Sequence, residues 1–280
     1  GARRALPGPH DTVMDLAPLP DGAMVYGGGD PVLGRTAPDG WRLDPPVADM
    51  RAKRGGAFRV SGDGRRVWLG LGFRDETPVL VDLGARTVTP APAAPSDTAP
   101  PATDDLSVTD WLNTRSPRLD GAPLDLKPYE RSRGLAVAPD AARFLLGADW
   151  HVRLFDARGR CLKRHPVPGI AWGVHIPDRE TVAVAALADG TLTWYRLDDL
   201  TPLLTLFMDP ATLDWVAWTP TGYYDASPRG ADLIGWHVNR GPATEADFFP
   251  AGHFRDRFHH PDVVGHILDT LDEDQAVRRA

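Results

Sequence analysis

Lysine and cysteine are scarce in this 280-residue chain, and each scarcity excludes a class of protein. Lysine occurs at three positions, so 28 of the 31 basic residues are arginine, and 38 acidic residues give a net charge of −7. This balance does not support nucleic-acid binding, which needs an excess of basic residues. The single cysteine, Cys161, excludes an internal disulfide and a cysteine-based zinc site, and we expect a reducing, cytoplasmic setting.

Long apolar runs are also missing. The longest, such as residues 182–188, extend over about seven residues, whereas a helix needs ~20 to span a bilayer. We therefore expect no membrane partner. Residues 1–10 lack the apolar stretch of a signal peptide. The first residue is Gly1 rather than Met, which raises the hypothesis that a proteolytic boundary lies near this position.

Glycine and proline are abundant, with 28 residues of each. Proline is about twice as frequent as its usual ~5%, so the chain cannot be mostly helical. A hydrophobic content of 42%, including 9 tryptophans, is enough to fill a core. The composition therefore predicts a globular protein rich in strands and turns.

A short motif recurs along the chain: an apolar strand, a turn of the Pro-Asp-Gly kind, and a second apolar strand. The turns are centred on Asp21, Asp63, Asp140, Asp178 and Thr221. Their spacing is close to 40 residues, with one gap of nearly two periods between Asp63 and Asp140. Proline fixes φ, aspartate caps the local backbone and glycine accepts positive φ, so each motif predicts a tight hairpin. We expect a degenerate module in the long gap, where residues 88–102 are interpreted as a loop.

Further apolar segments follow three of these hairpins. Third strands are predicted within 78–87, 151–159 and 191–199, and weaker fourth strands within 161–169 and 202–209. Four strands in about 40 residues are typical of a propeller blade. We therefore predict an all-β fold, a β-propeller of five to six blade-like modules with a short helical C-terminal tail. We expect the ring to be incomplete and another segment or chain to complete a seven-bladed ring, because unpaired blade edges would otherwise be exposed.

The predicted division of the chain follows from these modules. It comprises first propeller blades (1–95), a degenerate blade or insertion (96–133), C-terminal propeller blades (134–250) and a helical tail or linker (251–280). Within the tail, apolar residues recur at helical spacing, which predicts a helix over about 261–270 with its apolar side docked on the propeller. The composition of residues 271–280 predicts an exposed linker, with a second helical turn from Asp272.

The modules resemble WD40-repeat blades. Leu154, Phe155 and Asp156 stand where that family's Trp-Asp dipeptide closes the third strand, although the family's Gly-His pair is missing. Four longer strings are more specific: VTDWLNTRSPRLDGAPLDL, YERSRGLAVAPDAARFLLGADWHVRLFDARG, LDWVAWTPTGYYDASPRGADLIGWHVNRG and ADFFPAGHFRDRFHHPDVV. They resemble the WD40-repeat β-propeller region of bacterial caspase-family proteins, which join such a propeller to a caspase-like cysteine protease domain. The resemblance implies a scaffold or sensor that binds and regulates a caspase-like protease, in cis or as a cleaved partner.

Candidate catalytic groups do not form a recognisable constellation. Cys161 is the only candidate cysteine nucleophile, and we interpret it as a structural residue on a strand. His253, His259 and His260 lie near one another in the sequence, but the stretch reads as a polar link into a helix rather than a zinc site. We therefore expect no enzyme activity, no cofactor and no metal in this chain. Two alternatives stay open: a small-molecule enzyme propeller of hydrolase or lactonase type, and a generic assembly platform unrelated to proteolysis.

We place a candidate partner-binding face on two sets of loops that share one side of a propeller. One set joins each blade to the next, and the other joins second to third strands. Mixed charge with aromatic residues is typical of protein interfaces, where Arg and Trp act as anchors, although ordinary solvated loops can have this composition too. The candidate residues are Arg51, Lys53, Arg54, Arg74, Arg131, Arg133, Asp149, Trp150, Trp172, Asp189 and Asp214, with Asp30 and Asp75 beside them.

Overall fold

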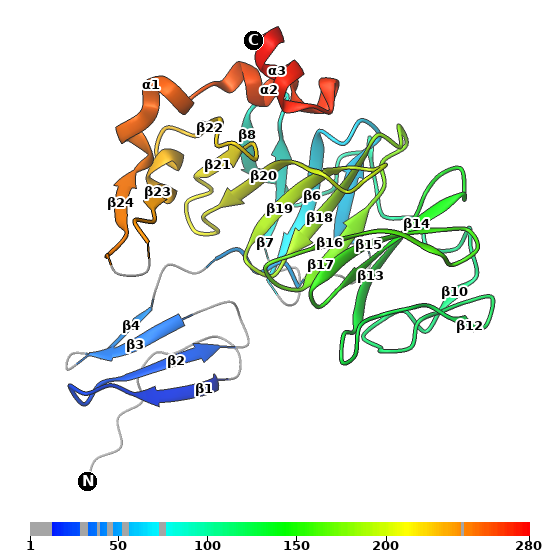
Figure 1. Cartoon of the computed structure of the whole chain (residues 1–280), viewed down its shortest axis with the longest axis horizontal. Helices are drawn as coiled ribbons and strands as arrows, with labels where there is room; N and C mark the ends of the chain where they lie inside the picture. The colour runs from blue at the N-terminus through cyan, green and yellow to red at the C-terminus, as the bar shows by residue number, and fades with distance from the viewer. Residues whose placement is uncertain are drawn as a thin grey trace.

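A computed structural model describes residues 13–28, 33–37, 40–43, 47–51, 56–72, 77–241 and 244–280 (Figure 1). The first sheet is an antiparallel meander of β1 (Val13–Pro18), β2 (Met24–Gly28), β3 (Leu33–Ala37) and β4 (Gly40–Leu43). Figure 1 shows this sheet set apart from the other sheets.

The second meander begins a more closely packed region. It contains β5 (Phe58–Ser61), β6 (Arg66–Leu71), β7 (Thr77–Asp82) and β8 (Thr87–Pro90), and β9 (Thr98–Ala99) pairs with the free side of β5. Most side chains of β5 and β6 are buried or alternate between buried and half-buried positions. The side chains of β8 are mostly exposed, as expected for an edge strand.

The long gap between hairpins contains more strand than the sequence indicated. The prediction of a loop over 88–102 was wrong at both ends, because β8 and β9 occupy parts of it. Strands form here despite the many prolines of the segment. Pro90 is tolerated because it lies at the end of an exposed edge strand, where its missing N–H interrupts no hydrogen-bonded ladder. The gap continues with a small three-stranded sheet of β10 (Val108–Thr109), β11 (Arg118–Leu119) and β12 (Ala122–Pro123).

Two further meanders follow in the sequence. The first contains β13 (Ser132–Val137), β14 (Arg143–Ala148), β15 (His151–Asp156) and β16 (Cys161–Pro166). The second is built of the four strands β17 (Ala171–His175), β18 (Val182–Leu187), β19 (Thr191–Arg196) and β20 (Pro202–Met208).

The fifth hairpin does not start a separate sheet. Its strands β21 (Trp215–Trp218) and β22 (Tyr224–Ala226) extend the sheet of β17–β20, because β21 pairs with β20. The chain then forms the 3-10 helix η1 (Gly230–Leu233) and a two-stranded ribbon of β23 (Gly235–Val238) and β24 (Asp247–Pro250).

All five predicted turns lie between paired antiparallel strands, at Asp21, Asp63, Asp140, Asp178 and Thr221. The turn at Asp140 illustrates their chemistry. The Asp140 carboxylate accepts a hydrogen bond from the backbone N–H of Ala142 at 2.8 Å, and Ala141 has φ of 53°. Aspartate capping and a left-handed residue therefore make the turn even where glycine is missing.

The tail is helical, as predicted. After the 3-10 helix η2 (Ala251–Phe254) and the single turn α1 (Arg255–Phe258), α2 spans Pro261–Thr270 and buries Val263, Val264 and Ile267. Pro261 occupies the first turn, where its missing N–H costs no helical hydrogen bond.

The second helical turn predicted from Asp272 is present and most of its residues are exposed, but it is docked on the core through one residue. Helix α3 spans Glu273–Arg279, and the Asp272 carboxylate caps it by accepting from the backbone N–H of Gln275 at 2.8 Å. Ala276 is completely buried in the main apolar core. This charged helix therefore docks through Ala276, its one buried residue.

The core lies between meanders. Leu145 and Val174 belong to a cluster that joins the sheet of β13–β16 to that of β17–β20. On the other side, Val67 and Trp194 belong to the main cluster, which joins the β5–β8 meander to β18–β20 and to the tail helices. The Trp194 indole Nε1–H donates to the Gly64 carbonyl at 2.7 Å across this interface. The chain is thus an all-β protein of propeller-type, blade-like modules with a short helical C-terminal tail.

Candidate functional site: a groove at the meeting point of three inner strands

Three of the predicted partner-binding residues come together at a groove. Arg51, Arg133 and Trp172 line this hollow, whose volume is about 640 Å³. Ligand-binding pockets commonly enclose ~300–1,000 Å³. The other lining residues are mostly apolar or glycine: Gly56, Ala57, Phe58, Pro100, Pro101, Trp111, Leu112, Asn113, Gly134, Leu135, Gly173 and Val174.

The groove lies where the first strands of three meanders meet. Its lining includes Phe58 from β5, Leu135 from β13 and Val174 from β17. Loops that follow β9 and β10 supply its outer wall. Segments far apart in the sequence therefore form one surface, which local sequence patterns do not reveal.

Two β-bulges place the predicted residues on this surface. The pairing of β13 with β14 shifts between Ser132 and Gly134, which leaves Arg133 as the extra residue. The pairing of β17 with β18 shifts between Ala171 and Gly173, which leaves Trp172 as the extra residue. Bulges bend a strand and redirect a side chain, and they are frequent next to functional sites.

A glycine follows each of the two bulges, and the neighbouring strands approach it closely. A Cβ on Gly134 would lie 3.2 Å from the Trp172 carbonyl oxygen, and a Cβ on Gly173 would lie 3.0 Å from a ring carbon of Phe58. The strands can approach one another only because these positions lack side chains.

Arg133 is held in place from three directions. Its Nε donates to Asp149 at 2.6 Å and its Nη1 donates to the Asn113 side-chain oxygen at 2.7 Å. Its guanidinium lies 5.2 Å from the centroid of the Trp172 ring, within the range of a cation–π interaction. The pair Arg133–Trp172 is thus preorganised, which lowers the entropic cost of binding a partner.

Arg51 and Arg131 extend the charged rim. Arg51 donates from Nε and Nη2 to the Asp49 carboxylate at 2.9 and 2.7 Å. The Arg131 backbone N–H donates to Asp149 at 3.0 Å, and its Nη1 donates to Asn113 at 3.4 Å. Asp149 and Asn113 therefore link Arg131 to Arg133, whereas Arg51 is held separately by Asp49.

Glu130, the residue that precedes Arg131, belongs to a buried ionic cluster. Glu130 is fully buried, and its carboxylate contacts His151 Nδ1 at 2.8 Å and Arg153 Nη2 at 2.5 Å. Burial by itself raises the pKa of Glu130, but hydrogen bonds from Arg153, the Lys127 backbone and His151 outweigh it and lower the pKa. Glu130 is therefore ionised, and it fixes the position of the rim.

Trp150, Asp189 and Asp214 are described residues that do not line the groove. Trp150 lies at the β14–β15 turn beside Asp149 and is 46% exposed. Asp189 caps the β18–β19 turn by accepting from the Thr191 hydroxyl at 2.7 Å, and Asp214 pairs with Arg229 at 2.7 Å. Asp30, Lys53, Arg54, Arg74 and Asp75 lie outside the described residues.

Sequence reasoning missed the outer wall of the groove. Trp111, Leu112 and Asn113 lie in the segment that was interpreted as a degenerate blade or insertion. Leu112 is 62% exposed and lies between Trp111 and Asn113 on this wall. A Trp-Leu pair in a stretch without strand periodicity is the sequence signal that could have identified it.

The candidate catalytic residues are placed apart. Cys161 begins β16 and packs against a core cluster, and its thiol lies 3.5 Å from the Lys163 carbonyl. His253 stacks on Phe249, whereas His259 packs against Tyr224 with a centroid distance of 5.1 Å. Within the described part of the chain, no three His, Cys, Asp or Glu side chains are grouped in a way that could hold a metal ion.

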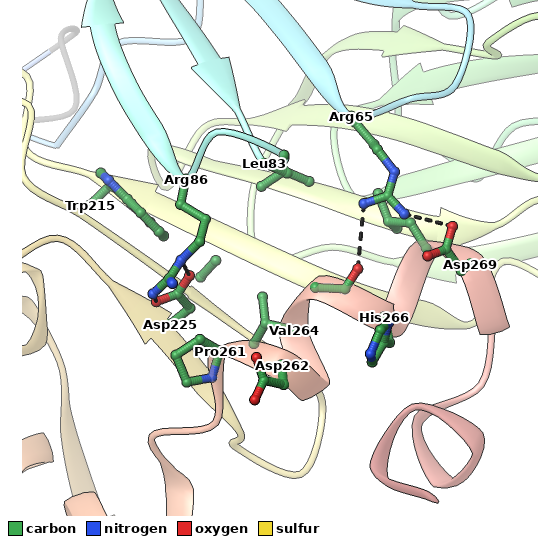
Figure 2. A pocket seen from close by; sticks show the side chains of 14 residues that line it. Arg65, Leu83, Arg86, Trp215, Asp225, Pro261, Asp262, Val264, His266 and Asp269 are labelled. Carbon is green, nitrogen blue, oxygen red and sulfur yellow. Dashed lines mark hydrogen bonds and ion pairs between the residues drawn. The ribbon is translucent and has the colours of Figure 1, made fainter. Parts of the chain in front are cut away.

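A second hollow of about 360 Å³ lies between α2 and the strands it covers (Figure 2). Arg65 reaches from the β5–β6 turn to Asp269 on α2 at 2.7 Å, while Arg86 in the β7–β8 turn bonds Asp225 on β22. Their charges are thus used in fastening the tail to the sheets. We interpret this hollow as part of that joint.

The chemistry of the first groove favours binding over catalysis. The described residues that line it include no carboxylate, imidazole, thiol or hydroxyl side chain. General acid–base or nucleophilic catalysis needs such groups within reach of a substrate. Aromatic rings beside guanidinium groups, in contrast, are the usual anchors of protein interfaces.

No helix among the described residues is long and apolar enough to cross a bilayer.

No protein-family model matches the chain, and no curated protein matches it. Among solved structures, it is similar to the β-propeller domain of Cps50 (Swd1) from Myceliophteria thermophila, at 10% identity and a TM-score of 0.31, over 77% of this chain and 85% of that one. It is also similar to the computationally designed Ika8 protein, at 15% identity and a TM-score of 0.31, over 76% of this chain and 85% of that one.

Proposed function

We propose that this chain is a non-catalytic protein-interaction module whose partner docks on the groove around Arg133 and Trp172. The observation that carries the proposal is the preorganised pair itself, which two β-bulges direct onto an apolar hollow that lacks catalytic groups. Interface energy is concentrated in a few such Trp, Tyr and Arg residues.

We further propose that the partner is a caspase-like protease domain, which the module holds or regulates. The support for this part is the resemblance of its long aromatic-rich strings to the propeller region of bacterial caspase-family proteins. One of these strings contains Trp111, Leu112 and Asn113, which form the outer wall of the groove.

The test is a binding and activity measurement with a purified caspase-like protease domain from the same genome. We expect the chain to bind it in calorimetry and to change its rate on a fluorogenic peptide. Trp172→Ala is expected to weaken binding at least about tenfold, as for an interface anchor. Phe248→Ala is the matched control, because Phe248 is an exposed aromatic residue on the β23–β24 ribbon, away from the groove.

Each outcome is informative. If the protease domain neither binds nor changes its rate, the protease connection is wrong. If it binds equally well to the Trp172→Ala and Phe248→Ala variants, the groove is not the docking site.

A further inference from the structure

We propose that the groove binds an acidic linear segment of its partner that carries a large apolar anchor residue; this inference rests on the proposed function. The first observation is the charge of the rim. Arg115 follows Asn113 by two residues, and Arg131 Nη1 donates to the Asn113 side-chain oxygen at 3.4 Å. Within the described part of the chain, neither guanidinium forms an ion pair with a carboxylate.

The positive rim contrasts with the whole chain. The net charge of the chain is −7, with 38 acidic and 31 basic residues. Arg51 pairs with Asp49 and Arg133 pairs with Asp149, whereas Arg115 and Arg131 add positive charge beside the groove with no carboxylate partner among the described residues. Electrostatic complementarity then favours an acidic segment at this place and disfavours a basic one.

The second observation is the apolar surface beside these charges. Leu112 is 62% exposed and Tyr129 is 74% exposed, and the Arg115 guanidinium lies 5.4 Å from the centroid of the Tyr129 ring. Exposed large apolar residues that surround a hollow are typical of a docking surface. Of the two, Leu112 lines the hollow itself, together with Phe58 and Trp111.

The two observations define the occupant together. A carboxylate of the segment can accept from the guanidinium of Arg131 or Arg115 at the rim, because guanidinium groups bind carboxylates with well-defined geometry. A neighbouring Trp, Phe or Leu side chain of the same segment enters the apolar hollow between Phe58 and Trp172. Neither a purely acidic nor a purely apolar segment uses both parts of the surface.

The test is selection of a randomised peptide library, displayed on phage, against the immobilised full chain. We expect selected peptides to be enriched in Asp or Glu next to Trp, Phe or Leu. A synthetic fluorescein-labelled peptide from this selection should bind at least about tenfold more tightly than two versions of itself, one with its acids replaced by amides and one with its apolar anchor replaced by alanine.

Matched variants of the chain sharpen the test. The double variant Arg115→Glu, Arg131→Glu should reverse the charge preference of the selection, and Arg115→Gln, Arg131→Gln should abolish it and reduce the salt dependence of binding. Arg158→Glu is the control, since Arg158 is an exposed arginine whose backbone N–H, rather than its side chain, donates to the Asp156 carboxylate. Thermal unfolding of each variant confirms that it is folded.

Failure of this inference differs from failure of the proposed function. Selection of basic or uncharged peptides, or no selection at all, overturns the acidic segment. If the chain still binds the protease domain through Trp172 in that case, the proposed function stands and only the peptide class is wrong. If Trp172→Ala changes neither kind of binding, both proposals fall.

Discussion

Arg86 and Asp225 form a two-pronged ion pair across the joint between the β7–β8 turn and β22. Arg86 Nε and Nη2 donate to the two carboxylate oxygens of Asp225 at 2.7 and 2.6 Å. The Asp225 side chain is only 3% exposed, whereas that of Arg86 is 53% exposed. Asp225 therefore depends on Arg86 as its charged partner, and the pair fastens the β5–β8 meander to the sheet that α2 covers.

Replacing Arg86 by Leu is expected to destabilise the protein by about 2 kcal/mol. The substitution leaves the buried carboxylate of Asp225 without its partner, and an unsatisfied buried acceptor costs about 1–3 kcal/mol. The half-exposed position of Arg86 keeps the effect below that of a fully buried pair. Urea unfolding monitored by tryptophan fluorescence measures the change in unfolding free energy.

Two further variants make this prediction specific. The double variant Arg86→Leu, Asp225→Leu should regain part of the unfolding free energy that Arg86→Leu alone loses, because no buried charge remains. Arg158→Ala, at an exposed arginine, should change the unfolding free energy by less than about 0.5 kcal/mol. An Arg86→Leu protein as stable as the Arg158→Ala protein would show that the pair contributes nothing to the joint.

Several features of the fold were predictable because their causes are local. The turn at Asp63 is set by its own residues, since the Asp63 carboxylate accepts from the Arg65 backbone N–H at 3.1 Å. Helix α2 is set by apolar residues at helical spacing. The docking of α3 was not predictable, because burial of Ala276 depends on a core assembled from three other segments.

The candidate site was predictable only in part, for the same reason. Arg133 and Trp172 were identified by composition and by their place in loops between blades. The bulges that direct them to one surface arise from cross-strand register, which the sequence of one strand does not specify. Trp111 was missed because its segment has no strand periodicity, and its contact with the groove is made by chain topology alone.

The stability of the protein is expected to fall on mild acidification because of His175. Burial lowers the pKa of His175 below its ordinary value of about 6.5, against a smaller opposing effect of hydrogen bonds and of Asp178. The unfolded chain therefore binds this proton at a pH where the folded protein does not. Stability is complete above about pH 6.5 and is lost, at up to ~1.4 kcal/mol per pH unit, as the pH falls towards the lowered folded pKa.

The measurement is urea unfolding at about pH 7.5 and pH 5.5. His175→Gln is the informative variant, since a neutral amide can still donate to the Ala99 carbonyl, which His175 Nε2 contacts at 2.9 Å. We expect the unfolding free energy of the variant to fall less than that of the original chain between the two pH values, because its amide does not titrate. The pKa values of His165 and His259 are also lowered by burial, so some acid sensitivity should remain in the variant. An identical pH dependence in both proteins would contradict the role of His175.

Gly147→Ala is expected to destabilise the protein strongly. A Cβ at this position in β14 would lie 2.5 Å from the Ala171 carbonyl oxygen of β17, so the two meanders would have to separate. Overpacking of this kind costs about 1–3 kcal/mol or more. Gly265→Ala is the matched control, because no atom lies within 4 Å of its added Cβ. Because Gly265 lies within α2 and alanine has a higher helix propensity than glycine, Gly265→Ala should stabilise the protein by about 0.5–1 kcal/mol.

The last prediction concerns the attachment of α3. The Glu273 carboxylate accepts hydrogen bonds from the hydroxyls of Thr219 and Thr221, the latter at 2.6 Å, so the β21–β22 turn holds the first turn of the helix. Glu273→Ala should therefore speed amide hydrogen exchange throughout α3 about tenfold, because the helix is then retained mainly by burial of Ala276. Gln275→Ala changes an exposed position of the same helix and should leave exchange nearly unchanged. If both variants exchange at the same rate, the carboxylate does not hold the helix and burial of Ala276 alone explains its docking. If only the Glu273 variant exchanges faster, the last helix is fastened to the sheet by a polar contact that its charged sequence supplies.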